Sequence, residues 1–520
     1  MSELVRITRA TAIIGAATLL SRILGFVRDM VIAWVLGAGL VSDAFLAAFR
    51  LPDLMRRLFV EGAFSMAFVP VFSERLAVEG RVSALKLASS AGRMLAVVLI
   101  GTVIVGILAA PALVQILAPG FSTRPAQFDM AVSLVRIMLP YVFFIGMTAL
   151  FAAVLNGFGH FAAPAFSPLI LNVSVICFAL STVFAPDSPA FLMALGVLFG
   201  GLFQMLLQFP FLINRRAFSL SSFGTWADPG IKKIRHRLIP SIFGASAYQI
   251  NLVLGTLLAS FSGMGGISYL YYADRLIQFP LGIFAVSAST ALLPGLCRQA
   301  CLKQSDQMLE DFEKTLGLIF FLTLPAMMGI IVLRQPMVDL LFCHGAFDIQ
   351  SSRLTANALL YYGMGLWAIA GTRVLTPVFY ALGEIRIPVR SSAISICVYG
   401  VLGASLMTFM GYSGLALAAS VAAAANFGLL VRRMPRDRLE WRWKNLRDSF
   451  LMSFTLSSIM GLGVWLISRE LIPHRTGWPL AAGLFGCISA GILIYGALSI
   501  VCLRSEMKWV WALFESRGKR

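Results

Sequence analysis

The sequence predicts an all-α protein that crosses a membrane many times. Of its 520 residues, 59% are hydrophobic and only 13% are charged, and the mean hydropathy is +0.85. Apolar stretches of about 20 residues recur along the chain, which is the length that an α-helix needs to cross the hydrocarbon layer. They lack the alternating pattern of membrane β-strands. This composition excludes an ordinary soluble globular protein.

Fourteen stretches are long and apolar enough to be membrane-spanning helices. The first of them contains three charged residues and no small-residue cleavage site, so we expect a retained helix rather than a signal peptide. The predicted spans are 11–36, 43–73, 92–116, 130–156, 163–185, 190–213, 237–261, 267–297, 315–333, 354–381, 388–410, 412–431, 448–468 and 477–503.

The distribution of basic residues predicts the orientation. Cytoplasmic loops of membrane proteins are rich in lysine and arginine. With a cytoplasmic N-terminus, 29 of the 42 lysine and arginine residues fall in cytoplasmic segments, counting Arg93, Arg237 and Arg390 at the cytoplasmic ends of their spans, and five fall in outer loops. We therefore expect both termini in the cytoplasm. The net charge of +18 reflects this topology and contact with anionic lipids, and it requires no nucleic acid partner.

An internal repeat divides the spans into two predicted six-helix lobes. The segment LNGFGHFAAP (155–164) resembles FYALGEIRIP (379–388), and Gly159 matches Gly383 at an offset of 224 residues. Transporters are commonly built from such repeats, with the binding site between them. The predicted divisions are an N-terminal lobe at 1–224, a C-terminal lobe at 225–447, and two further helices with a basic cytoplasmic tail at 448–520.

Ionisable residues are concentrated within the first two spans. A charge at the bilayer centre costs about 2.5–3.5 kcal/mol on insertion scales, so such residues normally face a protein interior or a watery cavity. Within the spans, apart from the residues at their cytoplasmic ends, eight arginines outnumber five carboxylates. Because guanidinium groups bind phosphate and carboxylate in a bidentate manner, we expect an anionic substrate such as a phosphate ester. The residues in the first two spans are Arg22, Arg28, Asp29, Asp43, Arg50, Asp53, Arg56, Arg57 and Glu61.

Helical geometry distinguishes the arginines of the second span. Arg57 has Asp53 at i−4 and Glu61 at i+4, so a structural ion-pair role is at least as strong an interpretation as a ligand role. Arg56 has no neighbour at this spacing, which favours it as a site for an anionic ligand. An alternating stripe of about 80° is formed by Asp43, Arg50, Asp53, Arg57 and Glu61.

The sequence contains no signature of an enzyme, a metal site or a cofactor site. Its four histidines are isolated, and neither an HExxH motif nor a nucleophile elbow nor a P-loop is present. The seven cysteines are scattered without a CxxC pair and are expected to be small buried hydrophobes. We therefore expect a transporter rather than an enzyme.

Several motifs resemble those of one transporter family. They are SRILGFVRD (21–29), LPDLMRRLFVEGAFSMAFVP (51–70), YYADRLIQFPLG (271–282) and YALGEIRIPV (380–389). These segments resemble the MurJ (MviN) lipid II flippases of the MOP exporter superfamily, and the resemblance covers essentially the whole chain. It implies two six-helix lobes around a cationic cavity, and a hydrophobic groove for an undecaprenyl tail at the last two helices.

The resemblance also implies a substrate and its binding residues. The implied activity is alternating-access transfer of lipid II, the undecaprenyl-pyrophosphate-linked peptidoglycan precursor, to the outer leaflet of the bacterial cytoplasmic membrane. Further implied partners are membrane lipids and the cell-wall synthesis machinery. The substrate-binding residues carried over by motif are Arg22, Arg28, Asp43, Arg56 and Arg275. The supporting cavity residues are Asp29, Arg50, Asp53, Arg57, Glu61, Asp274 and Gln278.

The chain departs from the family pattern at two places. Some relatives carry glutamate where this chain has Gln278, so no acid titrates at that position. Some relatives bind sodium between the seventh and eleventh helices, but here the seventh offers Asn251 and neither helix has an embedded acid. This departure counts against sodium coupling through that site.

Three alternative functions remain open at this stage. A flippase for another polyprenyl-pyrophosphate-linked oligosaccharide, such as an O-antigen or capsule unit, would need the same arginines. A drug or cation antiporter of related fold predicts an acidic cavity instead. A scaffold for cell-wall enzymes would tolerate the loss of Arg28 or Arg56.

Overall fold

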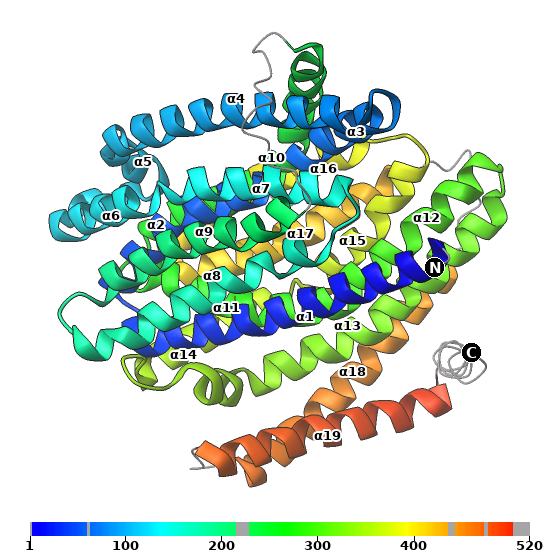
Figure 1. Ribbon diagram of the computed structural model, residues 1–520. Coiled ribbons are helices and arrows are strands. Elements are labelled where there is room, and N and C mark those ends of the chain that lie inside the picture. Colours follow the sequence, from blue (N-terminus) through cyan, green and yellow to red (C-terminus); the bar gives the residue numbers. More distant parts are fainter. Residues whose placement is uncertain (1–2, 60–62, 215–227, 435–442, 473–476, 503–520) are drawn as a thin grey trace. The chain divides into compact units, whose positions relative to one another are not determined.

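The structure is a computed structural model that describes residues 3–59, 63–214, 228–434, 443–472 and 477–502. Its described residues form helices joined by short turns and contain no strand (Figure 1). The predicted all-α class is therefore confirmed. Each predicted span overlaps a helix or a broken pair of helices. Ten described segments are long and apolar enough to cross a membrane, so the number fourteen stays a prediction.

The first half of the chain contains long helices interrupted by short breaks. Several of the helices that follow a break carry a proline in their first turn, for example at Pro111, Pro119 and Pro125. The helices are α1 (Glu3–Leu36), α2 (Leu40–Phe59), α3 (Ala63–Val78), α4 (Gly80–Leu108), α5 (Ala110–Leu117), η1 (Pro119–Thr123), α6 (Pro125–Met138), α7 (Tyr141–Gly157), α8 (Ala162–Leu180), η2 (Ser181–Phe184), α9 (Pro189–Asn214) and α10 (Pro229–Ser260).

The second half begins with one long span that contains a π-helical segment. This segment, η3, follows directly after Pro280, whose missing N–H disturbs the regular backbone hydrogen bonds of the helix. The helices are α11 (Gly266–Pro280), η3 (Leu281–Val286), α12 (Ser287–Cys301), α13 (Ser305–Phe342), α14 (Ile349–Gly363), α15 (Leu366–Ala381), α16 (Arg386–Met410), α17 (Tyr412–Arg432), α18 (Trp443–Leu471) and α19 (Gly477–Cys502).

The residues matched by the internal repeat adopt the same turn. Gly159 and Gly383 have φ angles of +72° and +78°, a region that glycine enters without a Cβ penalty. His160 donates its backbone N–H to the carbonyl of Leu155 at 2.8 Å, and the matching N–H of Glu384 donates to Phe379 at 2.8 Å. Both helices that precede the repeated motif therefore end in the same way. The division into lobes at 224 and 447 stays a prediction.

Packing divides the chain into two compact units at a different position. Unit 1 comprises Met1–Ser268 with Gly345–Phe347, and unit 2 comprises Tyr269–His344 with Asp348–Arg520. Helix α10 therefore packs in unit 1, although it follows the predicted repeat boundary. Contacts define the units, whereas sequence similarity defines the repeat, so the two divisions need not coincide.

An ion pair fixes the beginning of α10 within unit 1. Arg75 of α3 donates from Nη1 to both carboxylate oxygens of Asp228 at 2.6 and 2.7 Å. Asp228 is the N-cap of α10 and also accepts the N–H of Gly230 at 2.8 Å. Glu79 accepts hydrogen bonds from Ser83 and Arg75, and these contacts lower the pKa of its carboxyl group below the ordinary value. One arginine thus joins α3, the turn before α4 and α10.

A glycine in η1 and a glycine between α13 and α14 meet the ends of α10 and α1 within unit 1. Gly120 donates its N–H to Ser260 Oγ at 3.0 Å, and a Cβ at Gly120 would lie 2.2 Å from the Ser260 carbonyl oxygen. Ala346 donates its N–H to the Trp34 carbonyl at 2.9 Å, and a Cβ at the adjacent Gly345 would lie 2.5 Å from that oxygen. Helices α1 and α10 begin the two predicted lobes, so each contacts a loop of the other lobe.

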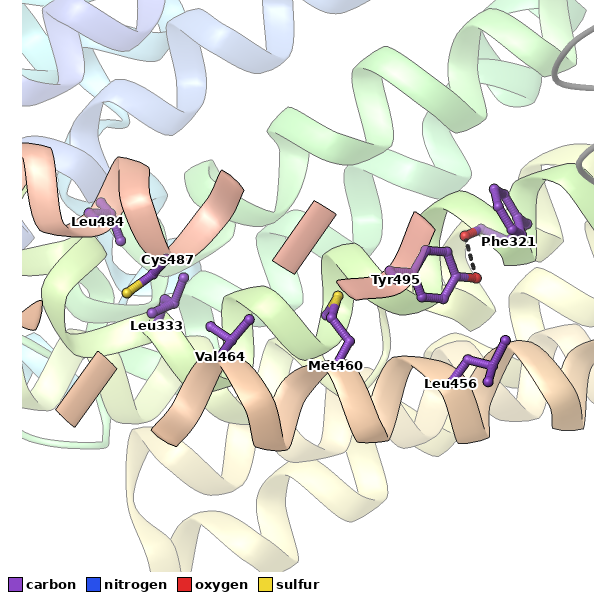
Figure 2. Packing of buried hydrophobic residues seen from close by; sticks show 8 residues of the cluster. All are labelled: Phe321, Leu333, Leu456, Met460, Val464, Leu484, Cys487 and Tyr495. Atoms are coloured by element: carbon purple, nitrogen blue, oxygen red, sulfur yellow. Dashed lines mark hydrogen bonds between the residues drawn. The ribbon is translucent and has the colours of Figure 1, made fainter. Parts of the chain in front are cut away.

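In unit 2, α18 and α19 pack against α13 through a buried apolar cluster (Figure 2). Cys487 is fully buried there, and the hydroxyl of Tyr495 donates to the Phe321 carbonyl at 3.0 Å. The side chains on the other faces include exposed large hydrophobic residues. Such faces suit lipid, because lipid tails solvate apolar side chains as well as a protein core does. The cluster comprises Phe321, Leu333, Leu456, Met460, Val464, Leu484, Cys487 and Tyr495.

We expect Gly120→Ala to lower the stability of the protein by about 1–3 kcal/mol, the usual cost of overpacking. The new Cβ would clash with a backbone carbonyl, so the end of α10 would have to move. Thermal unfolding of the detergent-purified protein measures the change. Gly101→Ala in α4 is the control, because a Cβ there meets no described heavy atom within 4 Å. Equal unfolding midpoints for the two variants would contradict the tight contact.

Candidate functional site

The buried centre of the candidate site is the Arg28–Asp29 pair on α1. Arg28 is 6% exposed and Asp29 is fully buried. The guanidinium donates from Nε and Nη2 to Asp29 Oδ1 at 3.1 and 2.7 Å, and from Nη1 to Asn172 Oδ1 of α8 at 3.2 Å. Its carbon centre lies 5.4 Å from the centroid of the Phe49 ring of α2. Three helices therefore hold one arginine.

On α2, a single carboxylate serves two arginines. Arg57 Nε donates to Asp53 Oδ2 at 3.0 Å, which confirms the predicted pair at i−4. Arg56 Nη2 donates to Asp53 Oδ1 at 2.9 Å, so the prediction that Arg56 lacks a partner on its own helix was wrong. Side chains three residues apart also meet on a helix, whereas the prediction considered only neighbours four residues away. Both arginines are about one-fifth exposed, so solvent screens these pairs.

Arg50 connects α2 to α10. Its Nε donates to Thr256 Oγ1 at 3.0 Å, and that hydroxyl donates in turn to the Leu252 carbonyl at 3.1 Å. Thr256 is 2% exposed. This contact holds a half-buried guanidinium at the interface of two helices of unit 1.

Asp43 caps the beginning of α11. Its Oδ2 accepts the N–H of Gly265 at 2.7 Å, and its Oδ1 accepts the N–H and the hydroxyl of Ser268 at 2.8 and 2.6 Å. Only 1% of the residue is exposed. A carboxylate at a helix N-terminus is favoured both by the unsatisfied N–H groups and by the helix dipole. The contacts observed at Asp43 are therefore with two backbone N–H groups and one hydroxyl of the α11 N-terminus, and its contribution to substrate binding stays a prediction.

The remaining predicted residues of unit 1 are Arg22 and Glu61. Arg22 lies on α1 with its side chain exposed. Glu61 lies outside the described residues. The described segment from Ser21 to Phe59 thus contains five arginines and three aspartates, which leaves a positive balance.

The predicted residues of unit 2 lie together on α11. Arg275 Nη2 donates to the Tyr271 hydroxyl at 2.9 Å, and its guanidinium lies 5.0 Å from the centroid of the same ring. Asp274 accepts a hydrogen bond from Gln278 Nε2 at 3.3 Å. The amide at position 278 thus acts as a donor, which a carboxylate could not do. Among the residues that the structure describes, no group of His, Cys, Asp and Glu side chains is arranged to hold a metal ion.

This arrangement of unit 1 suits the binding of an anion. Arginine cannot be neutralised by proton loss, so its charge persists even in an apolar environment. Asp29 and Asp53 offset part of the desolvation cost without cancelling the five arginines. Sequence reasoning missed Asn172, Thr256 and Phe49. An isolated asparagine within an apolar span is a signal that could have indicated the first of these.

Comparison with known proteins supports the resemblance. A sequence model described as "Lipid II flippase MurJ" matches residues 32–477. A probable lipid II flippase MurJ of Vibrio cholerae is 36% identical over 508 residues, which cover 95% of this chain and 96% of the relative. The chain belongs to the MurJ lipid II flippase family. Membership confirms the resemblance seen in the motifs, and it makes the chain a multi-pass membrane protein.

Solved structures agree with membership of the MurJ family. A structure described as lipid II flippase MurJ in an inward closed conformation has a TM-score of 0.80 at 25% identity, covering 95% of this chain and 99% of that chain. An inward-facing multidrug resistance MATE transporter of the MOP superfamily has a TM-score of 0.67 at 16% identity, covering 82% of this chain and 96% of that chain. The second likeness shows that the chain shares its fold with that transporter.

We expect Asp43→Asn to destabilise the protein by about 1–3 kcal/mol. In asparagine an NH2 group replaces one of the two acceptor oxygens, so a buried backbone N–H would face another donor. Asp348→Asn is the matched control. Asp348 accepts the N–H of Ser351 at 2.7 Å at the start of α14, but it is exposed, so its loss should cost about 1 kcal/mol or less. Thermal unfolding of both variants compares the two caps. A larger loss at Asp348 would contradict the buried cap.

Proposed function

We propose that the protein is a lipid II flippase of the bacterial cytoplasmic membrane. In this proposal it moves undecaprenyl-pyrophosphate-linked peptidoglycan precursor from the inner to the outer leaflet, and both of its termini face the cytoplasm. The supporting observation is 36% identity to a probable lipid II flippase MurJ along nearly the whole chain. The activity is transport rather than catalysis, and its partners are lipid II and the surrounding membrane lipids. Contact with cell-wall synthesis enzymes stays a prediction.

The arginines of α1, α2 and α11 are proposed to bind the pyrophosphate headgroup. The described part of α1 and α2 carries more arginines than carboxylates, which supports an anionic cargo. A pyrophosphate leaves water only if fixed cations replace its hydration. Arg28, Arg56 and Arg275 are proposed as the main contacts, with Arg22 and Asp43 as further binding residues. The supporting cavity residues are proposed to be Asp29, Arg50, Asp53, Arg57, Glu61, Asp274 and Gln278.

The undecaprenyl tail is proposed to remain in lipid or along α18 and α19. Large hydrophobic side chains exposed on these helices support this route, for example Phe454 and Trp465 on α18 and Phe485 and Leu493 on α19. The buried cluster against α13 would keep the two helices attached to unit 2 while a tail lies on their outer faces. Such an arrangement allows the apolar part of the substrate to cross without entering a charged cavity.

Alternating access is proposed as the transport cycle. The contacts of Gly120 with Ser260 and of Gly345 with Trp34 join elements of the two predicted lobes at the predicted outer side. These contacts would have to break when the substrate is released outward. One hydrogen bond from Gly120 N–H to the Ser260 hydroxyl, one from Ala346 N–H to the Trp34 carbonyl, and close packing are weak enough to be reversed on the timescale of transport.

The proposal predicts that Arg28→Ala and Arg56→Ala abolish complementation when the native protein is depleted. Loss of one headgroup contact is expected to reduce transport about tenfold or more. The measurement is the accessibility of lipid II at the outer leaflet of intact cells. Lys314→Ala, which removes a partly exposed side chain paired with Glu310, is the control and should transport normally.

The same depletion distinguishes the alternative cargo. Lysis with lipid II retained at the inner leaflet supports the lipid II proposal. Viable cells that lack only a surface polysaccharide would instead identify the cargo as another polyprenyl-pyrophosphate-linked oligosaccharide, such as an O-antigen or capsule unit. Normal transport by both arginine variants, inserted at normal levels, would contradict the proposed role of the guanidinium groups.

A further inference from the structure

Asn172 is a buried amide in a largely apolar helix. It lies in the middle of α8, and 6% of the residue is exposed. An amide in this environment is costly unless its polar atoms form hydrogen bonds. Its Oδ1 accepts from Arg28 Nη1 at 3.2 Å, and its Nδ2 donates to the Ser21 carbonyl at 3.2 Å. Both of these partners belong to α1, which packs along α8.

The chemistry of the partners fixes the orientation of this amide. A guanidinium group only donates hydrogen bonds, and a backbone carbonyl only accepts them. The oxygen of Asn172 must therefore face Arg28, and its nitrogen must face Ser21. The reverse orientation would place two donors against each other and two acceptors against each other. The amide thus connects the backbone of α1 to the guanidinium of the same helix about two turns further along.

Gly25 leaves the space that this connection requires. A Cβ at Gly25 would lie 3.6 Å from Asn172 Nδ2, which is ordinary van der Waals contact, so the amide lies directly over the glycine. A larger side chain at that position would occupy the region between Ser21 and Arg28. The small residue therefore allows an amide from α8 to reach both groups of α1.

Asn172 and Asp29 act on different edges of the Arg28 guanidinium. Asp29 accepts from Nε and Nη2, whereas Asn172 accepts from Nη1. Asp29 compensates charge, but the Asn172 amide is neutral and leaves the positive charge in place. An arginine side chain that is already held in one conformation loses less rotamer entropy when an anion binds than a freely moving one does.

We propose that Asn172 is a positioning residue that fixes the guanidinium of Arg28 for the anionic headgroup. This inference rests on the proposed function, because it assumes that Arg28 contacts the pyrophosphate. Asn172 itself acts through Arg28 and needs no contact with the substrate. Its effect on binding must therefore disappear when Arg28 is absent.

The test is a double-mutant cycle on the full-length protein in nanodiscs, with purified lipid II as the probe. Asn172→Leu is expected to weaken lipid II binding about tenfold, the effect of losing a hydrogen bond to a charged group. Arg28→Ala should weaken binding at least as much. In the double variant, Asn172→Leu should cause no loss of affinity beyond that of Arg28→Ala. If Asn172 had a merely structural role, its own loss would be added to that of Arg28→Ala.

Ser174→Ala is the matched control on the same helix. Ser174 is also 6% exposed, and its hydroxyl donates to the Gly196 carbonyl of α9 at 2.8 Å, so the variant removes a buried interhelical bond without touching Arg28. Its lipid II affinity should equal that of the unaltered protein. If Asn172→Leu does not insert, Asn172→Ala repeats the cycle. It removes the acceptor for Arg28 without adding charge, so about tenfold weaker binding and the same non-additivity are expected.

The outcomes separate this inference from the proposed function. Normal binding by Asn172→Leu together with weak binding by Arg28→Ala would overturn the positioning role and leave the flippase proposal intact. An equal loss caused by Asn172→Leu in the presence and absence of Arg28 would also overturn it, because the effect would then not pass through the arginine. Unchanged binding by Arg28→Ala would contradict the proposed headgroup contact itself.

Discussion

The cost of placing guanidinium groups within apolar helices constrains the rest of unit 1. Each arginine must keep its charge to attract an anion, yet it must form enough hydrogen bonds to be tolerated away from bulk water. Arg28 meets both requirements with one carboxylate, one neutral amide and one aromatic ring. On α2, Asp53 accepts hydrogen bonds from two arginines, and the described segment from Ser21 to Phe59 carries five arginines against three aspartates. Partial compensation is what a reversible anion site needs, because complete neutralisation would remove the attraction.

Besides a charged site, a transporter needs contacts between helices that can be broken, and here helix ends and glycines form them. Asp43 holds the beginning of α11 through two backbone N–H groups and a hydroxyl. The ends of α1 and α10 are held by close backbone approach at Gly345 and Gly120. These contacts depend on geometry rather than on large buried area. A transporter needs such contacts, since a large apolar interface would fix a single conformation.

The strongest physical signals in the sequence predicted the fold class and the arginine-rich segment, because apolar length and charges within spans are local properties. The ion pair of Arg57 with Asp53 was predictable for the same reason. The pair of Arg56 with Asp53 needed the i−3 neighbour to be considered as well. Asn172 lies 144 residues from Arg28, so local spacing could not bring them together. The packing of α10 in unit 1 could not be predicted from the sequence either, because the internal repeat reports sequence similarity and not which helices are in contact.

The central claim is that fixed guanidinium groups replace water around a phosphorylated lipid. The most direct measurement compares the affinity of the purified protein for undecaprenyl pyrophosphate with its affinity for undecaprenol, at low and high salt. The account predicts at least about tenfold tighter binding of the pyrophosphate, with a difference that narrows as salt screens the charges. Equal affinity for the two lipids would contradict it, because the tail alone would then account for binding.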